Sequence, residues 1–182
     1  RDEGGMLRFR VLGSGSDGNA TLVEGGGGRL LLDAGLGPRQ LAERLAAAGV
    51  DPGSLDAILV SHEHGDHTRG ASAFSRKWGV PIAGSRATMA AADFPAEKLP
   101  PLRALEPGAT LAFAGLTVRA VPVPHDAARP LAFLLTASGA TFGHATDVGH
   151  VSRSLVEALL GCHALLLESN HDPAMLRDLS LI

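Results

Sequence analysis

Residues 57–67 read AILVSHEHGDH, an apolar run followed at once by three histidines and two carboxylates. The first four residues are typical of a short buried strand, so the polar side chains begin where that strand ends. Four potential metal ligands then fall within six positions, namely His62, His64, Asp66 and His67. Zinc-type sites favour imidazole and carboxylate ligands gathered in this way. The stretch therefore predicts a metal site at a strand end, against the alternative of an exposed polar loop.

The spacing inside this stretch predicts that one loop can serve two metal ions. His62 and His64 are two residues apart, so in extended backbone their side chains project to the same side. Gly65 allows a sharp turn, which brings Asp66 and His67 to a neighbouring position.

Two later residues each follow a predicted strand and are candidate partners for this loop. His125 lies in the stretch VPHD at residues 123–126, and Asp147 lies in TDVG at residues 146–149. A carboxylate at position 147 can bridge two cations with its two oxygens. The alternatives are an ordinary loop histidine at position 125 and, for Asp147, a cap for the helix expected near Val151.

Working outward, the rest of the chain predicts alternating strands and helices. Alternating apolar and basic residues at 7–12 indicate a strand with one buried face. Further strands are expected at 20–23, 30–32, 80–83, 111–113, 116–123, 131–136, 140–145 and 164–167, and helices at 38–48, 69–78, 85–92 and 151–160. Each half repeats a β-rich segment, a helix and a strand. This order favours an α+β fold in which two sheets stack between helices, a four-layer αββα sandwich.

Length and composition limit the remaining possibilities. A chain of 182 residues is expected to form one domain over residues 1–182. With 16 basic and 19 acidic residues its net charge is −3, so no overall basic field attracts nucleic acid, although a local patch or a metal can supply positive charge. Cys162 is the only cysteine, which excludes an intrachain disulfide, and no apolar run approaches the length of a membrane helix. These features predict a soluble cytoplasmic protein without a membrane partner.

The pattern His-x-His-x-Asp-His, followed by a distant His and a distant Asp, resembles the signature of the metallo-β-lactamase fold superfamily. The resemblance implies two divalent metal ions, with zinc expected and manganese or iron as alternatives. It assigns His62, His64 and His125 to one ion, Asp66 and His67 to the other, and Asp147 as the bridge. Asp66 is also the expected catalytic residue. Asp33 matches the early structural aspartate that would orient the metal loop, with a helix cap as its alternative role.

A closer resemblance is to the WalJ/YycJ-like subgroup of bacterial proteins, which implies 5′-to-3′ DNA exonuclease activity with DNA as the substrate. It is carried by the stretches GSGSDGNA at 13–20, VSHEHGDH at 60–67, PHDAA at 124–128, ATDVG at 145–149 and LESNHD at 167–172. The superfamily places a last metal-binding histidine beyond this point, and none follows His171. Two explanations are open: the fold lacks its C-terminal part, with residues 179–180 as a remnant of that segment, or His150 or His171 takes the missing role.

The implied mechanism is hydrolysis of a phosphodiester by a metal-bridging hydroxide, because two cations lower the pKa of bound water from 15.7 toward ~7. Arg129 and Arg69 are candidates for contacting substrate phosphates, with solvated surface charge as the alternative. The backbone of residues 13–19 is read either as an anion-binding nest or as an ordinary turn. A hydrolase of small esters, lactones or thioesters is the second functional hypothesis. The third is a metal-stabilised interaction module without catalysis. The sequence leaves the oligomeric state open.

Overall fold

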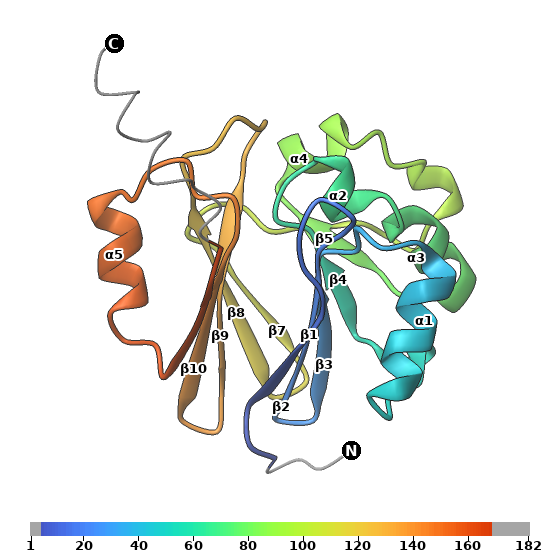
Figure 1. Cartoon of the computed structure of the whole chain (residues 1–182), viewed down its shortest axis with the longest axis horizontal. Helices are drawn as coiled ribbons and strands as arrows, with labels where there is room; N and C mark the ends of the chain where they lie inside the picture. Colours follow the sequence, from blue (N-terminus) through green and yellow to red (C-terminus); the bar gives the residue numbers. More distant parts are fainter. Residues whose placement is uncertain (1–4, 169–182) are drawn as a thin grey trace.

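The computed structural model describes residues 5–168, and its strands form two sheets (Figure 1). The first sheet has the order β1-β2-β3-β4-β5-β6. Its strands are β1 (Arg8–Gly13), β2 (Ala20–Gly25), β3 (Gly28–Leu32), β4 (Ala57–Leu59), β5 (Ile82–Gly84) and β6 (Arg103–Ala104). The second sheet has the order β11-β10-β9-β8-β7. Its strands are β7 (Thr110–Phe113), β8 (Leu116–Pro122), β9 (Leu131–Ala137), β10 (Ala140–Ala145) and β11 (Ala164–Leu167).

Each sheet combines an antiparallel meander with parallel pairs. Strands β1 to β3 are antiparallel, whereas β3 to β6 pair in parallel and are therefore joined by crossover helices. These helices are α1 (Pro38–Ala47), α2 (Gly65–Thr68), α3 (Ala71–Trp78) and α4 (Arg86–Ala91), with short 3₁₀ turns at Pro52–Ser54 and Ala96–Lys98. In the second sheet β7 to β10 are antiparallel, and α5 (Arg153–Leu159) crosses from β10 to its parallel neighbour β11.

Three apolar cores separate four layers. Alternation along β4 divides its residues between two cores, because Ala57 and Leu59 face the second sheet while Ile58 packs with the residues of α1 and α3. A third core, which includes Leu155 of α5, lies on the outer face of the second sheet. Figure 1 shows α1 to α4 outside the first sheet and α5 outside the second. This is the predicted αββα sandwich.

The predicted strands and helices are confirmed, with two additions and one correction. The strand expected at 7–12 forms as β1, but its apolar face is not buried, because Phe9 and Val11 are exposed at the edge of the sheet. The helix expected at 69–78 is preceded by a separate short helix, α2, which begins at Gly65 inside the metal-ligand stretch. Strand β6 was not expected, because two residues that pair with β5 carry no periodic signal of their own. The predictions that concern His171 and residues 179–180 lie outside the described residues.

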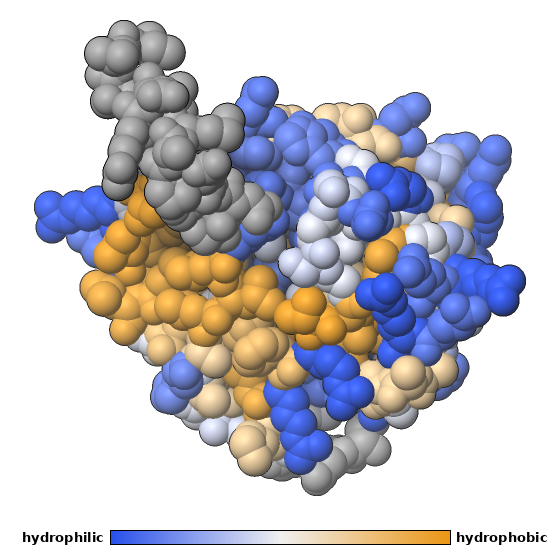
Figure 2. Space-filling model, viewed as in Figure 1, coloured by the Kyte–Doolittle hydropathy of each residue, from blue (hydrophilic) through white to orange (hydrophobic). Residues whose placement is uncertain are grey.

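The edge strands of the two sheets leave apolar side chains on the surface. Phe9 and Val11 of β1 and Leu165 and Leu167 of β11 are exposed, and Figure 2 shows an apolar band on this face. Among residues 5–168, no helix has both the length and the apolar character that crossing a membrane requires.

Candidate metal centre

The predicted ligands gather where the ends of both sheets meet. His62 and His64 follow β4, His67 lies on α2, His125 lies in the loop between β8 and β9, and Asp147 follows β10. Two groups of ligand atoms result, each with its atoms within 4.8 Å of one another. One group is His62, His64 and His125, and the other is His62, His67 and Asp147. His62 therefore belongs to both groups.

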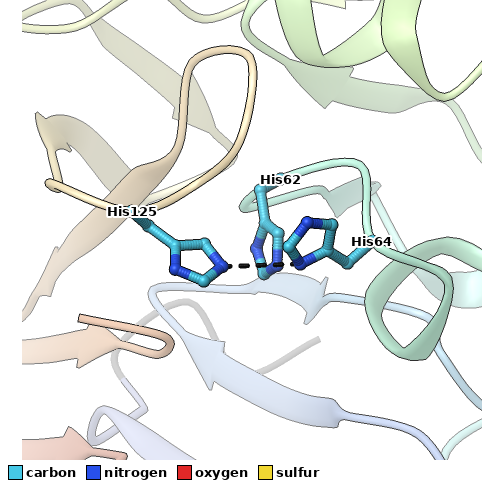
Figure 3. A group of neighbouring side chains, drawn as sticks. All are labelled: His62, His64 and His125. Carbon is cyan, nitrogen blue, oxygen red and sulfur yellow. Dashed lines mark hydrogen bonds between the residues drawn. The ribbon is translucent and has the colours of Figure 1, made fainter. Parts of the chain in front are cut away.

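The group of three histidines joins the two sheets. The rings of His62 and His64 lie 4.6 Å apart, and the ring of His125 lies 4.9 Å from that of His62, all in edge-to-face arrangement. Figure 3 shows the three imidazoles converging, with His125 reaching across from the opposite loop. Nδ1 of His64 and Nε2 of His125 lie within hydrogen-bond distance, at 3.4 Å.

Asp33 anchors the ligand-bearing loop through contacts with Ser61 and His67. Its Oδ1 accepts a hydrogen bond from the backbone N–H of Ser61 at 2.8 Å, and its Oδ2 accepts from the Ser61 hydroxyl at 2.9 Å. Oδ2 also lies 2.9 Å from Nδ1 of His67. Helix α1 begins instead after Gly37, so Asp33 is not its cap.

The hydrogen bonds of Ser61 fix the tautomer of His62. The Ser61 hydroxyl gives its single proton to Asp33, so at Nδ1 of His62, 3.0 Å away, the hydroxyl oxygen can only accept. Nδ1 of His62 therefore carries the proton, and the lone pair lies on Nε2. Nε2 is buried and has no hydrogen-bond partner among the described residues.

The two buried histidines of the loop have opposite protonation tendencies. Burial, together with the charge of the nearby His67, lowers the pKa of His62 to about 4, against the opposing charges of Asp33 and Asp147. Burial also opposes the charged form of His67, but hydrogen bonds to Asp147 and Asp33, together with their charges, outweigh it and raise the pKa to about 10. The distances agree, because Nε2 of His67 lies 2.8 Å from Oδ2 of Asp147.

Asp147 belongs to the second group and lies near both of its histidines. Its Oδ2 lies 3.7 Å from Nε2 of His62, in addition to its contact with His67. The hydrogen bond with His67 lowers the pKa of Asp147 against the effect of partial burial. Its alternative role as a helix cap does not apply, because Ser152 caps α5 by accepting from the backbone N–H of Leu155.

Asp66 lies beside the second group rather than in it. Its Oδ2 is 3.4 Å from Nε2 of His67 and accepts a hydrogen bond from Nδ2 of Asn19 at 3.2 Å.

Asn19 ends the Gly-rich loop, and its backbone N–H donates to the carbonyl of Asp66 at 2.7 Å. Within this loop the N–H of Gly15 donates to Oδ1 of Asn19, and that of Gly18 to the carbonyl of Gly15. These bonds favour an ordinary turn over an anion-binding nest.

The remaining predicted residues lie around this centre. Arg69 is exposed, and its Nη1 donates to the carbonyl of Asp17 at 3.3 Å. The side chain of Arg129 is exposed, while its carbonyl accepts from the hydroxyls of Ser85 and Thr88, both at 3.2 Å. His150 is exposed and belongs to neither ligand group.

Sequence reasoning missed three residues at the centre. Asn19 contacts both Asp66 and His67, Glu63 reaches the loop that carries His125, and His144 is buried nearby. Asn19 was included only as part of the Gly-rich loop. A local sequence signal could not have assigned these contacts, because those of Asn19 and Glu63 join residues 47 to 65 positions apart.

The residues present fit divalent metal ions. The test is the buried Nε2 of His62, whose lone pair faces the other ligand atoms and has no hydrogen-bond partner in the described part of the chain. Imidazole nitrogens and carboxylate oxygens are the donors that zinc, manganese and iron accept. Asp33, through Ser61 and His67, supplies the outer hydrogen bonds that orient metal-ligating histidines.

Comparisons with known proteins agree with this fold. Residues 28–178 match the family described as the Beta-lactamase superfamily domain. The chain is 31% identical over 176 residues to the exodeoxyribonuclease WalJ of Streptococcus pneumoniae and 32% identical over 173 residues to the exodeoxyribonuclease YycJ of Bacillus anthracis. Each alignment covers 94% of this chain, but the chain spans only 65% and 66% of the lengths of these relatives.

Solved structures show the same architecture. The metallo-beta-lactamase fold protein YhfI from Bacillus subtilis superposes with a TM-score of 0.72 at 19% sequence identity, covering 87% of this chain and 70% of that chain. At this identity the likeness shows the fold alone.

Proposed function

The chain belongs to the β-lactamase superfamily and has the metallo-β-lactamase fold, and from this premise we propose that it is a metal-dependent phosphodiesterase that acts as a 5′-to-3′ DNA exonuclease. The observation that carries the proposal is the pair of ligand groups that share the buried His62. The similarity to two exodeoxyribonucleases supports DNA as the substrate. The proposal treats residues 1–182 as one domain.

The proposal places two divalent ions, with zinc as the first choice, in these two groups. When bound, such ions stabilise negative charge on a phosphate as Lewis acids and make a water nucleophile available at neutral pH. His62, His64 and His125 would hold one ion. His67 and Asp66 would hold the other, and Asp147 would bridge, as its position between the two buried histidines favours.

The surrounding residues prepare the ligand atoms for this role. Ser61 keeps the lone pair of His62 on Nε2, and burial keeps that ring neutral. Asp33 accepts a hydrogen bond from Nδ1–H of His67, so Nε2 is the atom that faces Asp147. Without metal, Nε2 of His67 holds a proton against Asp147, and loading the site requires release of this proton.

Asp66 is the proposed catalytic carboxylate. The hydrogen bond from Asn19 orients its Oδ2, which lies beside Nε2 of His67. From this position Oδ2 can accept the proton that the attacking water gives up. Arg69 follows α2 and Arg129 lies in the loop between β8 and β9; both are exposed and are proposed to contact phosphates of the DNA.

A pair of end-labelled DNA substrates tests the function. Purified protein is incubated with Mn²⁺ or Zn²⁺ and a linear duplex labelled at the 5′ end or at the 3′ end of one strand. We expect early release of labelled mononucleotide from the 5′-labelled strand only. The variants His64→Ala and Asp147→Ala are expected to lose at least 100-fold in rate, on the order of the loss from removing key stabilising groups at other active sites. Glu43→Gln, at an exposed glutamate of α1, serves as the control.

A chromogenic ester, lactone and thioester are assayed in parallel. Cleavage of one of these without degradation of DNA would replace the exonuclease with a small-molecule hydrolase on the same site. Metal binding without cleavage of either class would indicate an interaction module. Early release from the 3′ label would contradict the proposed polarity.

A further inference from the structure

The three-histidine group depends on how one loop of the second sheet is held against the first. His62 and His64 follow β4, whereas His125 belongs to the segment that joins β8 to β9. The first sheet therefore supplies two of the three histidines, and the second sheet supplies the third. Nothing in the local sequence around His125 sets its distance from the other two histidines, so contacts between the loops must do so.

Several backbone contacts hold the ends of the His125 loop. The N–H of Leu131 donates to the carbonyl of Ser61 at 2.9 Å, and the N–H of Gly149 donates to the carbonyl of Pro124 at 2.8 Å. The hydroxyls of Ser85 and Thr88 hold the carbonyl of Arg129. These contacts fix where the loop leaves and re-enters its sheet.

The middle of the loop is held by Glu63, which lies between two of the proposed ligands. Its Oε1 accepts the backbone N–H of Ala128 at 2.7 Å, across 65 positions of the chain. The N–H of Ala127 donates to the carbonyl of His125 at 2.9 Å, so a tight turn connects the anchored residue to the ligand. The Glu63 bond therefore links the two loops that carry the three histidines.

The second oxygen of Glu63 makes no comparable contact. Oε2 is buried and has no hydrogen-bond partner among residues 5–168. A buried carboxylate oxygen without a partner destabilises the fold. The hydrogen bond from Ala128 to Oε1 is therefore the contact through which Glu63 acts on the His125 loop.

We propose that Glu63 is a positioning residue of the metal site. The length of its side chain places the accepting oxygen so that the bond to Ala128 holds His125 opposite His62 and His64. This inference rests on the proposed metal binding and goes beyond it. The negative charge of Glu63 is not what matters on this view, because the bond to Ala128 needs only an oxygen at the position of Oε1.

Two substitutions separate the effect of side-chain length from the effect of charge. Glu63→Gln keeps the length and a carbonyl oxygen but removes the charge, whereas Glu63→Asp keeps the charge but is one methylene too short. The probe is Zn²⁺ alone, titrated into metal-free protein in competition with a chromogenic chelator. The melting temperature of the metal-free protein is measured for each variant.

We expect Glu63→Asp to weaken binding at one Zn²⁺ site by about 10- to 100-fold, as outer partners of metal ligands do. Glu63→Gln is expected to stay within about threefold of the wild type. Glu43→Asp and Glu43→Gln, at an exposed glutamate on α1, are the matched controls and should leave affinity unchanged. His125→Ala gives the reference for complete loss of the three-histidine group.

The comparison overturns the inference if Glu63→Asp binds Zn²⁺ as tightly as Glu63→Gln, or if the order is reversed. A lower melting temperature in Glu63→Asp with unchanged affinity for Zn²⁺ would make Glu63 a purely structural residue and would also overturn it. If the wild type binds no Zn²⁺, the proposed function fails and the inference falls with it. If the wild type binds and Glu63→Asp matches it, only the inference fails.

Discussion

His144 is buried and, among residues 5–168, forms no ion pair with a carboxylate, in contrast to His67. Burial lowers its pKa to about 4; the charge of Asp33 opposes this shift in part, and the charge of His67 adds to it. Its Nδ1 has no hydrogen-bond partner in the described region. The folded protein therefore accommodates His144 only as a neutral ring.

This burial predicts an acid-sensitive fold. Because the folded pKa of His144 lies below the unfolded value of 6.5, its contribution to stability is complete above pH 6.5 and is lost as the pH falls toward 4. We compare the metal-free proteins in the presence of a chelator. Across this interval we expect the unfolding free energy of His144→Leu to fall by roughly 3 kcal/mol less than that of the wild type. Urea denaturation at successive pH values measures this.

The control for the acid-sensitivity experiment is His150→Leu, at an exposed position. His62 is also buried with a lowered pKa, so His144→Leu should reduce the slope without removing it. If His144→Leu and the wild type lose stability equally between pH 6.5 and pH 4, burial of a neutral ring at position 144 is not the cause of the acid sensitivity.

At the scale of elements, the segment after β3 lies directly against the segment before and within α2. A Cβ atom added to Gly35 would lie 1.6 Å from the carbonyl oxygen of Asp66 and 2.8 Å from the backbone nitrogen of Asn19. The N–H of Gly35 donates to the carbonyl of Asn19 at 2.9 Å. Only glycine fits here, where three loops meet behind the metal ligands.

Two neighbouring glycines give a matched test of this contact. Gly35→Ala is expected to lower the unfolding free energy by about 3 kcal/mol, because the added methyl group forces Asp66 and Asn19 apart. Gly37→Ala should cost about 1 kcal/mol or less, because nothing lies within 4 Å of its Cβ and only a helix N-cap is altered. Guanidinium denaturation of both variants measures the difference, and equal losses would contradict the proposed tight packing.

Elements were predictable from the sequence where their pattern is local. The alternating residues 7–12 and the apolar run 57–60 indicated strands. The two faces of the run 57–60 divide between two cores as the period-2 pattern requires, whereas Phe9 and Val11 on the apolar face of β1 are exposed at the edge of the sheet. Helix α2 was missed because Gly65 and the ligands after it read as a loop. The approach of Asn19 and Glu63 to the ligands was also beyond reach, since both contacts depend on how distant loops dock.

At the scale of the whole molecule, the two sheets contact each other at both of their ends and through the apolar core between them. The hairpins β2–β3 and β7–β8 meet through a hydrogen bond from the N–H of Gly115 to the carbonyl of Gly26, at 2.8 Å. Figure 1 places these hairpins at the end opposite the ligand loops. Between them lies the core shared by the sheets. The three-histidine group closes the other end, because His125 comes from the second sheet and its partners from the first.

A metal ion in this group would therefore stabilise the packing of one sheet on the other. At free Zn²⁺ of about 100 times its Kd, we expect a gain of about 2.7 kcal/mol, which for a chain of this size raises the melting temperature by roughly 5–10 °C. His125→Ala should lose most of this shift while its metal-free melting temperature stays close to that of the wild type, and the exposed His150→Ala should keep the shift. Differential scanning calorimetry with and without Zn²⁺ measures both. A full shift in His125→Ala would mean that the ion is held by the first sheet and Asp147 alone, and that it does not link the two sheets through His125.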